Sequence, residues 1–181
     1  PQLTSPYRMY QYWINTDDRD VVKFLKLFTF LDLETIGKLE ETLRQNPEKR
    51  EPHRALASEF TKMVHGETAA KAVREVSEIL FGREVHGISE DTLDVLAAEV
   101  PVTRISKNRL HPGMPLVDAL IETRLAKSKR AARDLIGQGG AYVNNGAWKD
   151  IEARIDLNQT LSGRAVLLRS GKKTYHLLMV S

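Results

Sequence analysis

The sequence of 181 residues contains no cysteine. This absence excludes a disulfide framework, a thiol nucleophile and a thiolate metal site. Long apolar runs are also missing, since no stretch approaches the roughly 18 residues that a membrane-spanning helix requires. The first residues lack the basic and then apolar order of a signal peptide. From these absences we expect a cytoplasmic protein with no membrane partner.

Groups that would support catalysis are scarce. The five histidines are scattered, and none has a carboxylate at metal-ligand spacing. The glycine-rich run at residues 137–140 is predicted to follow a helix, whereas a phosphate-cradling loop precedes one. The sequence therefore predicts no catalytic residue, no metal site and no cofactor in this chain.

Positive charge is concentrated toward the C-terminus. The formal net charge is +3, but residues 1–113 carry 16 Lys and Arg against 18 Asp and Glu, while residues 114–181 carry 11 against 6. This excess predicts a C-terminal surface that faces a polyanion, although charge alone does not distinguish RNA from DNA.

The apolar spacing changes along the chain. Residues 1–100 show repeats at three- and four-residue intervals, which indicate successive amphipathic helices. Residues 101–113 are rich in proline and have no period, so they are predicted to be a linker. Residues 114–181 begin with short helices and then alternate as strands, with a hairpin turn at residues 170–173. The predicted fold class is α+β: an all-helical domain at 1–100, followed by a small α/β domain with short hairpins at 114–181.

The most informative segment is residues 128–145, SKRAARDLIGQGGAYVNN. Ser128 is predicted to cap a helix that buries its alanine, leucine and isoleucine side chains and exposes three basic ones. The two glycines would then end this helix, and a short strand would be folded back at Asn145-Gly146. A basic helix beside a tight turn suits phosphate binding. The alternative is an ordinary solvated basic face.

This segment resembles the S-four RNA-binding domain, whose pattern runs from a Ser-Lys/Arg start through a basic helix to Gly-Gly and Val-Asn-Gly. The sequence here departs at its end, because Val143 is followed by two asparagines before Gly146. We expect phosphate contacts to fix the register of the RNA and unpaired bases to provide sequence reading. The candidate RNA-binding residues are Lys127, Ser128, Lys129, Arg130, Arg133, Asn144, Arg169, Lys172 and Lys173.

A second resemblance covers nearly the whole chain. The stretches SPY at 5–7, YQYWINTDD at 10–18, KLFTF at 26–30, TKMVHGE at 61–67 and RSGKKTY at 169–175 are similar to bacterial and organellar tyrosyl-tRNA synthetases downstream of the catalytic domain. The nucleotide-binding signatures of that family would precede residue 1. The resemblance therefore identifies the chain as the tRNA-binding part of such an enzyme, a fragment that should be inactive alone.

The resemblance also implies partners. The intact enzyme would join tyrosine to its tRNA with ATP and magnesium, usually as a homodimer. Residues 1–100 would bind the anticodon arm, and residues 114–181 would form the S-four-like domain. Asp17 and Asp18 are candidates for accepting hydrogen bonds from a guanine of the anticodon, although capping of a helix is the simpler interpretation.

Two other functions remain open from the sequence. One is a non-enzymatic RNA-binding protein, such as a splicing factor or a ribosome-associated chaperone. The other is the RNA-binding part of an RNA-modifying enzyme, such as a pseudouridine synthase. The latter would need a catalytic Asp in a β-rich domain, and residues 1–100 show no strand periodicity.

Overall fold

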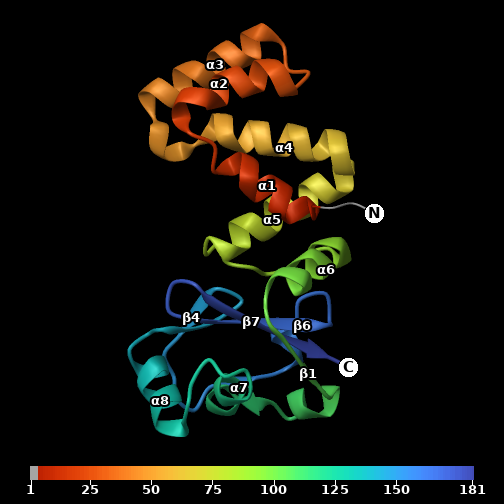
Figure 1. Cartoon of the computed structure of the whole chain (residues 1–181). Helices are drawn as coiled ribbons and strands as arrows, with labels where there is room; N and C mark the ends of the chain where they lie inside the picture. Colours follow the sequence, from red (N-terminus) through yellow and green to blue (C-terminus); the bar gives the residue numbers. More distant parts are fainter. Residues whose placement is uncertain (1–3) are drawn as a thin grey trace. The chain divides into compact units, whose positions relative to one another are not determined.

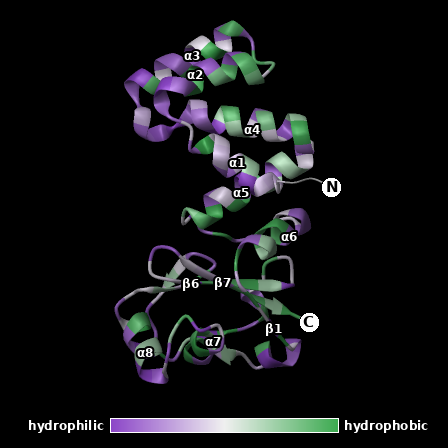
Figure 2. Ribbon diagram, viewed as in Figure 1, coloured by the Kyte–Doolittle hydropathy of each residue, from purple (hydrophilic) through white to green (hydrophobic). Residues whose placement is uncertain are grey.

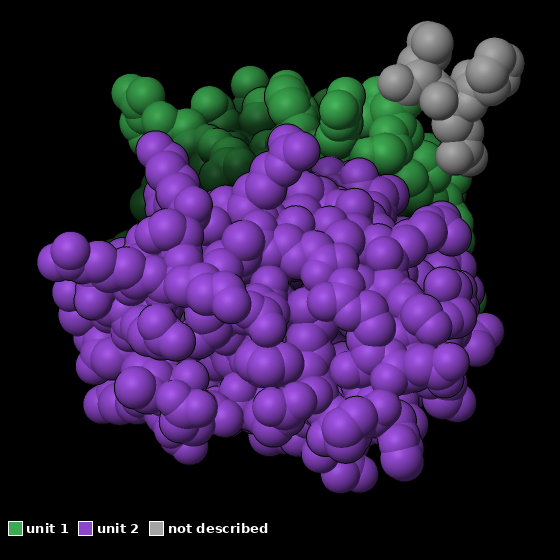
Figure 3. All heavy atoms as spheres, turned by 90° about the horizontal axis from the view of Figure 1, so that it is seen from below, with its two compact units in different colours: residues 1–77 green, residues 78–181 purple. Residues whose placement is uncertain are grey.

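The computed structural model describes residues 4–181 and forms two compact units, residues 1–77 and residues 78–181 (Figures 1 and 3). The predicted order, helices first and a helix-and-sheet part second, is confirmed.

The first unit is helical throughout its described part. Its elements are α1 (Pro6–Ile14), α2 (Asp18–Phe28), α3 (Leu33–Gln45), the 3-10 helix η1 (Pro47–Lys49), α4 (Glu51–His65) and most of α5 (Glu67–Leu80), which crosses into the second unit. Polar side chains define the starts of the first three helices. Ser5, Asp17 and Asp32 each accept a hydrogen bond from a backbone N–H of the first turn.

The core of the first unit combines aliphatic and aromatic side chains. Val21, Leu25 and Leu56 are fully buried and join α2 to α4. Trp13 of α1 packs beside them, with its ring centroid 4.7 Å from Phe60 and 5.4 Å from Phe28. Aromatic pairs in this geometry add stabilisation beyond the area they bury. Trp13 and the buried Tyr10 therefore serve packing, whereas Tyr12 is exposed.

The second unit is built around a five-stranded sheet, within the described residues, of order β1-β7-β6-β3-β4. Its elements are α6 (Glu90–Glu99), β1 (Val102–Ile105), η2 (Lys107–Leu110), β2 (Met114–Pro115), α7 (Leu116–Glu122), α8 (Lys129–Gly137), β3 (Ala141–Val143), β4 (Gly146–Trp148), β5 (Arg154–Ile155), η3 (Leu157–Gln159), β6 (Ala165–Ser170) and β7 (Thr174–Val180). Strands β2 and β5 pair separately, and β1 runs parallel to β7 while the other pairs of the main sheet are antiparallel.

The two faces of the sheet are covered by different elements. Val166, Leu168 and Leu178 pack on one face in the cluster that includes residues of α7 and α8. The end of α5 and α6 lie on the opposite side in this unit (Figure 1). Because successive side chains of a strand alternate in direction, the neighbours Leu167 and Leu177 face that second side and are also buried. Hydrophobic residues accordingly dominate β6, β7 and α7, while hydrophilic and hydrophobic residues alternate along α8 (Figure 2).

The hairpin between β3 and β4 turns one residue earlier than predicted. Val143 pairs with Gly146, so the two-residue loop is Asn144-Asn145, and both residues have positive φ, 51° and 66°. This is the type I′ geometry that suits the twist of a hairpin. Asn145 thus stands where the S-four pattern has glycine, and the second asparagine replaces that glycine without lengthening the turn.

The structure also divides the chain at a different place from the predicted linker. The two units meet within α5, between residues 77 and 78. Residues 101–113 contain β1, whose residues pair with Leu177 through Val180 of β7, and the 3-10 helix η2. The partner strand lies more than seventy positions away in sequence. A four-residue strand held by such a distant partner leaves no local period, which is why the sequence resembled a linker.

Candidate nucleic-acid interface

Helix α8 presents its basic residues to solvent, as predicted. Ser128 caps the helix, with its Oγ 3.2 Å from the backbone nitrogen of Ala131. Ala132 and Ile136 are fully buried against the core and Leu135 is partly buried, whereas Ala131, which was predicted to be buried with them, is exposed. The amphipathic spacing places the exposed side chains on the opposite face of the helix. These are Lys129, Arg130 and Arg133, and Lys127 just before the helix is exposed as well.

The electrostatics at the start of α8 are unusual for a helix. Its first turn contains no acidic residue and begins with Lys129 and Arg130. Cations near a helix N-terminus oppose the macrodipole, an effect of about 0.3–1 kcal/mol each at the surface. Asp118 compensates only weakly, since its Oδ1 lies 3.8 Å from the Lys129 Nζ and both side chains are well exposed. The arrangement disfavours the free helix and favours an anion bound at its N-terminus.

The end of α8 is fixed by the paired glycines. The Gly139 nitrogen donates to the Ile136 carbonyl and the Gly140 nitrogen to the Leu135 carbonyl, both at 2.9 Å, and Gly139 has φ 71°. These two bonds form a Schellman motif, which requires a left-handed residue. A Cβ on Gly140 would lie 2.7 Å from the Leu135 Cδ1. Gly139 is therefore favoured by its left-handed backbone, and a side chain at position 140 would require Leu135 to move.

The β6–β7 turn is tied to the same loop. The Gly171 nitrogen donates to the Gly140 carbonyl at 2.8 Å. Lys172 and Lys173 follow in the turn and are exposed. The structure thus connects two of the predicted basic segments, α8 and the β6–β7 turn, through the residues that end α8.

Two predicted RNA-binding residues also have partners within the protein. The Asn144 side chain donates to the Gln159 carbonyl at 2.7 Å and accepts from the Leu167 nitrogen at 3.0 Å, which joins the β3–β4 turn to β6 and η3. The Arg169 guanidinium stacks on Tyr142, with its Cζ 3.7 Å from the ring centroid. Cross-strand pairing places Tyr142, Arg169 and Tyr175 in one row, and Arg169 is only partly exposed. Both side chains hold the sheet together.

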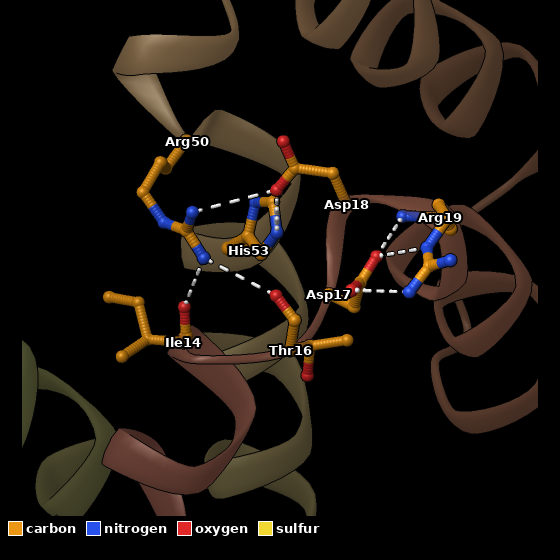
Figure 4. A network of polar contacts seen from close by, with 7 residues as sticks. All are labelled: Ile14, Thr16, Asp17, Asp18, Arg19, Arg50 and His53. Atoms are coloured by element: carbon orange, nitrogen blue, oxygen red, sulfur yellow. Dashed lines mark hydrogen bonds and ion pairs between the residues drawn. The ribbon is translucent and has the colours of Figure 1, made fainter.

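The two candidate anticodon carboxylates also have partners in the protein (Figure 4). Asp17 caps α2 and forms an ion pair with Arg19 at 2.9 Å. The hydrogen bonds from Arg19 hold the pKa of Asp17 at about 2, below its ordinary 3.8. Asp18 lies 3.1 Å from the His53 Nε2 and 3.5 Å from the Arg50 guanidinium. The capping interpretation is thus confirmed for Asp17, while Asp18 takes part in an ion-pair cluster.

This cluster joins the α1–α2 connection to the start of α4. The Arg50 Nη2 donates to the carbonyls of Ile14, at 2.9 Å, and Thr16, at 3.3 Å. His53 is fully buried beneath Arg50 and Asp18 (Figure 4). Burial lowers the pKa of His53 from 6.5, and the nearby Arg50 charge lowers it further, against the opposing pull of Asp18. The imidazole is therefore held neutral at neutral pH.

Sequence reasoning missed the aromatic row and this buried histidine cluster. The alternation of residues in AYV and RSGKKTY could have placed Tyr142 and Tyr175 on one face of the sheet. It could not have shown that Arg169 lies between the two rings, because that depends on the pairing of three strands. Among residues 4–181, no group of three or more His, Asp or Glu side chains is arranged to hold a metal ion. No helix in the described part of the chain is long and apolar enough to cross a membrane.

Comparison with known proteins gives two family matches. A model described as the tyrosine–tRNA ligase SYY-like C-terminal domain matches residues 92–178, and one described as tRNA synthetases class I (W and Y) matches residues 1–82. The tyrosine–tRNA ligase of Thermobifida fusca is 44% identical over 177 residues, which are 96% of this chain and 40% of that protein. That of Lactobacillus delbrueckii subsp. bulgaricus is 40% identical over 180 residues, 99% of this chain and 42% of that protein.

Among solved structures, a C-terminally truncated mitochondrial tyrosyl-tRNA synthetase from Aspergillus nidulans is 39% identical, covers 44% of this chain and 23% of that chain, and has a TM-score of 0.43. The chain spans less than half the length of the curated relatives it matches.

Proposed function

Because the chain belongs to the tyrosyl-tRNA synthetase family and matches its C-terminal part, we propose that it binds tyrosine tRNA and positions it for aminoacylation by a catalytic domain. That domain is proposed to belong to the same polypeptide and to act with ATP and magnesium. The intact enzyme is proposed to be a homodimer. The cytoplasm is the proposed location.

One observation carries this proposal. The first turn of α8 combines a capping serine with Lys129 and Arg130, and Arg133 extends the basic face by one turn. A helix N-terminus with added cations is suited to phosphate groups. A bound anion would offset the cost of placing these cations at the positive end of the helix dipole, which Asp118 offsets only weakly. We propose the phosphates of tRNA as that anion, with Lys127, Lys172 and Lys173 extending the contact.

The helical first unit is proposed to contact the anticodon arm. Asp17 and Asp18 remain candidates there, since their side chains are 48% and 50% exposed. A guanine that binds Asp17 would have to displace Arg19, because Arg19 already occupies both carboxylate oxygens. Both family matches describe tRNA synthetases, so they give no support to a splicing factor, a ribosome-associated chaperone or an RNA-modifying enzyme.

The test replaces Lys129, Arg130 and Arg133 together by alanine and measures affinity for tyrosine tRNA across a range of salt concentrations. Loss of three phosphate contacts should make the plot of log affinity against log salt shallower by about 2 to 3 units, at roughly 0.7–0.9 per contact. The fold should persist, because substitutions at exposed positions usually change stability by less than about 0.5 kcal/mol each.

A matched control removes the same charge elsewhere. Lys38, Arg44 and Lys71 are exposed on helices of the first unit, and each pairs with a glutamate four residues earlier. Their triple alanine variant should leave the salt slope almost unchanged. Equal weakening by both variants would show a diffuse electrostatic attraction and would contradict the assignment to α8. No preference for tyrosine tRNA over other tRNAs would contradict the proposed function itself.

A further inference from the structure

The second unit contains an apolar groove that the phosphate contacts do not explain. Its volume is about 650 Å³, within the range of small-ligand pockets, roughly 300–1,000 Å³. It lies between the end of α5, the end of α6 and the β6–β7 turn. The apolar walls are formed by Leu80, Phe81, Val100, Pro101 and Tyr175.

Phe81 is the most exposed of these residues, at 78% of its surface. Its position is nevertheless fixed, because it follows the last residue of α5 within a Schellman motif. The Gly82 nitrogen donates to the Ile79 carbonyl at 2.9 Å and the Arg83 nitrogen to the Glu78 carbonyl at 3.1 Å, with Gly82 at φ 102°.

The sheet holds this helix end in place. The Asn145 side chain donates to the carbonyls of Ile79 and Arg83, both at 2.8 Å. The Tyr175 hydroxyl donates to the Ile79 carbonyl at 3.3 Å. A large aromatic side chain is therefore kept in water on a rigid backbone. Phe81 lines the same groove as Leu80, Val100 and Pro101, so its exposed ring belongs to a contiguous apolar surface. Contiguous exposed apolar surface of this kind marks binding sites, whereas a single exposed side chain does not.

The charges around the groove are divided by sign. Lys172 and Lys173 line it from the β6–β7 turn, and Glu99 lines it from the end of α6. A phosphate would be attracted to the lysines and repelled by the carboxylate. The group beside Glu99 is therefore not an anion, and a flat, uncharged group that lies on Phe81 and donates a hydrogen bond to the carboxylate fits this position.

We propose that this groove binds one unpaired nucleobase of the bound RNA, stacked on Phe81, with the adjoining phosphate on Lys172 and Lys173. The proposal rests on the proposed function, since it assumes that the second unit binds RNA. A base in a duplex has no free face, so the occupant is an unpaired nucleotide. Stacking on an aromatic ring with cations along the backbone is the general mode of single-strand recognition.

Glu99 gives the groove a base preference. Cytosine presents an amino group that can donate to a carboxylate, whereas uracil presents a carbonyl oxygen at the same position. The two pyrimidines are alike in size, so they separate this hydrogen bond from stacking. Oligocytidine should bind more tightly than oligouridine, and Glu99→Gln should remove most of the difference, because an amide can pair with either base.

The test uses the full chain and an unstructured oligocytidine of about ten nucleotides, within the size range of single-strand sites. Phe81→Ala should weaken binding by about 5- to 150-fold, as loss of one stacked base does. The salt slope should stay unchanged, because no phosphate contact is removed. Phe81→Trp should retain affinity, while Phe81→Leu should lose most of it. Circular dichroism will establish that each variant is folded.

Phe30→Ala is the matched control, since Phe30 is 93% exposed in the first unit and lies outside the groove. The affinity of Phe30→Ala for oligocytidine should equal that of the unchanged chain. The groove assignment would be overturned if Phe81→Ala or Phe81→Leu bound oligocytidine as tightly as the unchanged chain does. It would also be overturned if Phe81→Ala changed only the association of the chain with itself and not its binding of RNA. If, in that case, the α8 triple variant still weakens tyrosine tRNA binding, the proposed function stands without the groove. If the unchanged chain binds no RNA, both fail.

Discussion

Replacing Asn145 by alanine should destabilise the second unit by about 2–4 kcal/mol. Asn145 is 4% exposed and has φ 66°, and its amide donates to the carbonyls of Ile79 and Arg83 at 2.8 Å. Two buried hydrogen bonds contribute about 1–3 kcal/mol together. Alanine in the left-handed region adds roughly 1 kcal/mol, which asparagine largely avoids.

The two contributions can be separated by a second substitution. Asn145→Gly keeps the left-handed backbone without strain and removes only the hydrogen bonds, so it should cost about 1–3 kcal/mol, less than alanine. Asn145→Asp should be the most damaging of the three, because it directs a carboxylate at two carbonyl oxygens and loses both donors.

The assay is urea denaturation followed by tryptophan fluorescence. Trp13 lies in the first unit and Trp148 in the second, so a Trp13→Phe background isolates the signal of the second unit. The order of stability should be Asn, then Gly, then Ala, then Asp. If Asn145→Gly is as stable as the unchanged protein, these hydrogen bonds do not stabilise the contact between residues 79–83 and the β3–β4 turn, and the reasoning is refuted.

Two further predictions concern groups inside the units. His53 has a folded-state pKa below 6.5, so the unfolded chain binds more protons than the folded chain just below that pH. The stability that neutral His53 contributes should therefore be complete above about pH 6.5 and should decline as the pH falls. In denaturation measured from pH 7 to 5, His53→Gln should reduce this dependence of stability on pH. Arg169→Met should lower the stability of the second unit by about 1 kcal/mol, because the contact with Tyr142 is lost. The salt dependence of tRNA binding should stay unchanged. A salt slope reduced by about one unit would show instead that Arg169 contacts a phosphate.

The elements predicted well from sequence are those whose causes are local. The serine cap, the buried face of α8 and its glycine end all follow from residues within five positions of one another. The exposed basic side chains of that helix follow from the same spacing. The β3–β4 hairpin was predicted one residue too late, because Asn145-Gly146 is the commoner turn pair and only the pairing of Val143 with Gly146 fixes the register.

The sequence was least informative about residues with distant partners. The stretch 101–113 lacks a local period because β1 takes its pairing from β7. Arg169 and Asn144 were predicted to bind RNA from the family patterns that contain them, and that role stays a prediction. No local pattern indicates their partners within the protein. Their partners in the fold are Tyr142, Leu167 and Gln159.

The sequence alone determined the family, the order of a helical part before a helix-and-sheet part, and the basic face of α8, because each is encoded by contiguous residues. Only the tertiary structure decided which polar side chains stay free for a ligand. It also brought Phe81 beside Lys172 and Lys173, which are about ninety positions away in sequence. The physical reason is that a hydrogen bond or a groove depends on distances in space, which chain folding sets and local sequence does not record.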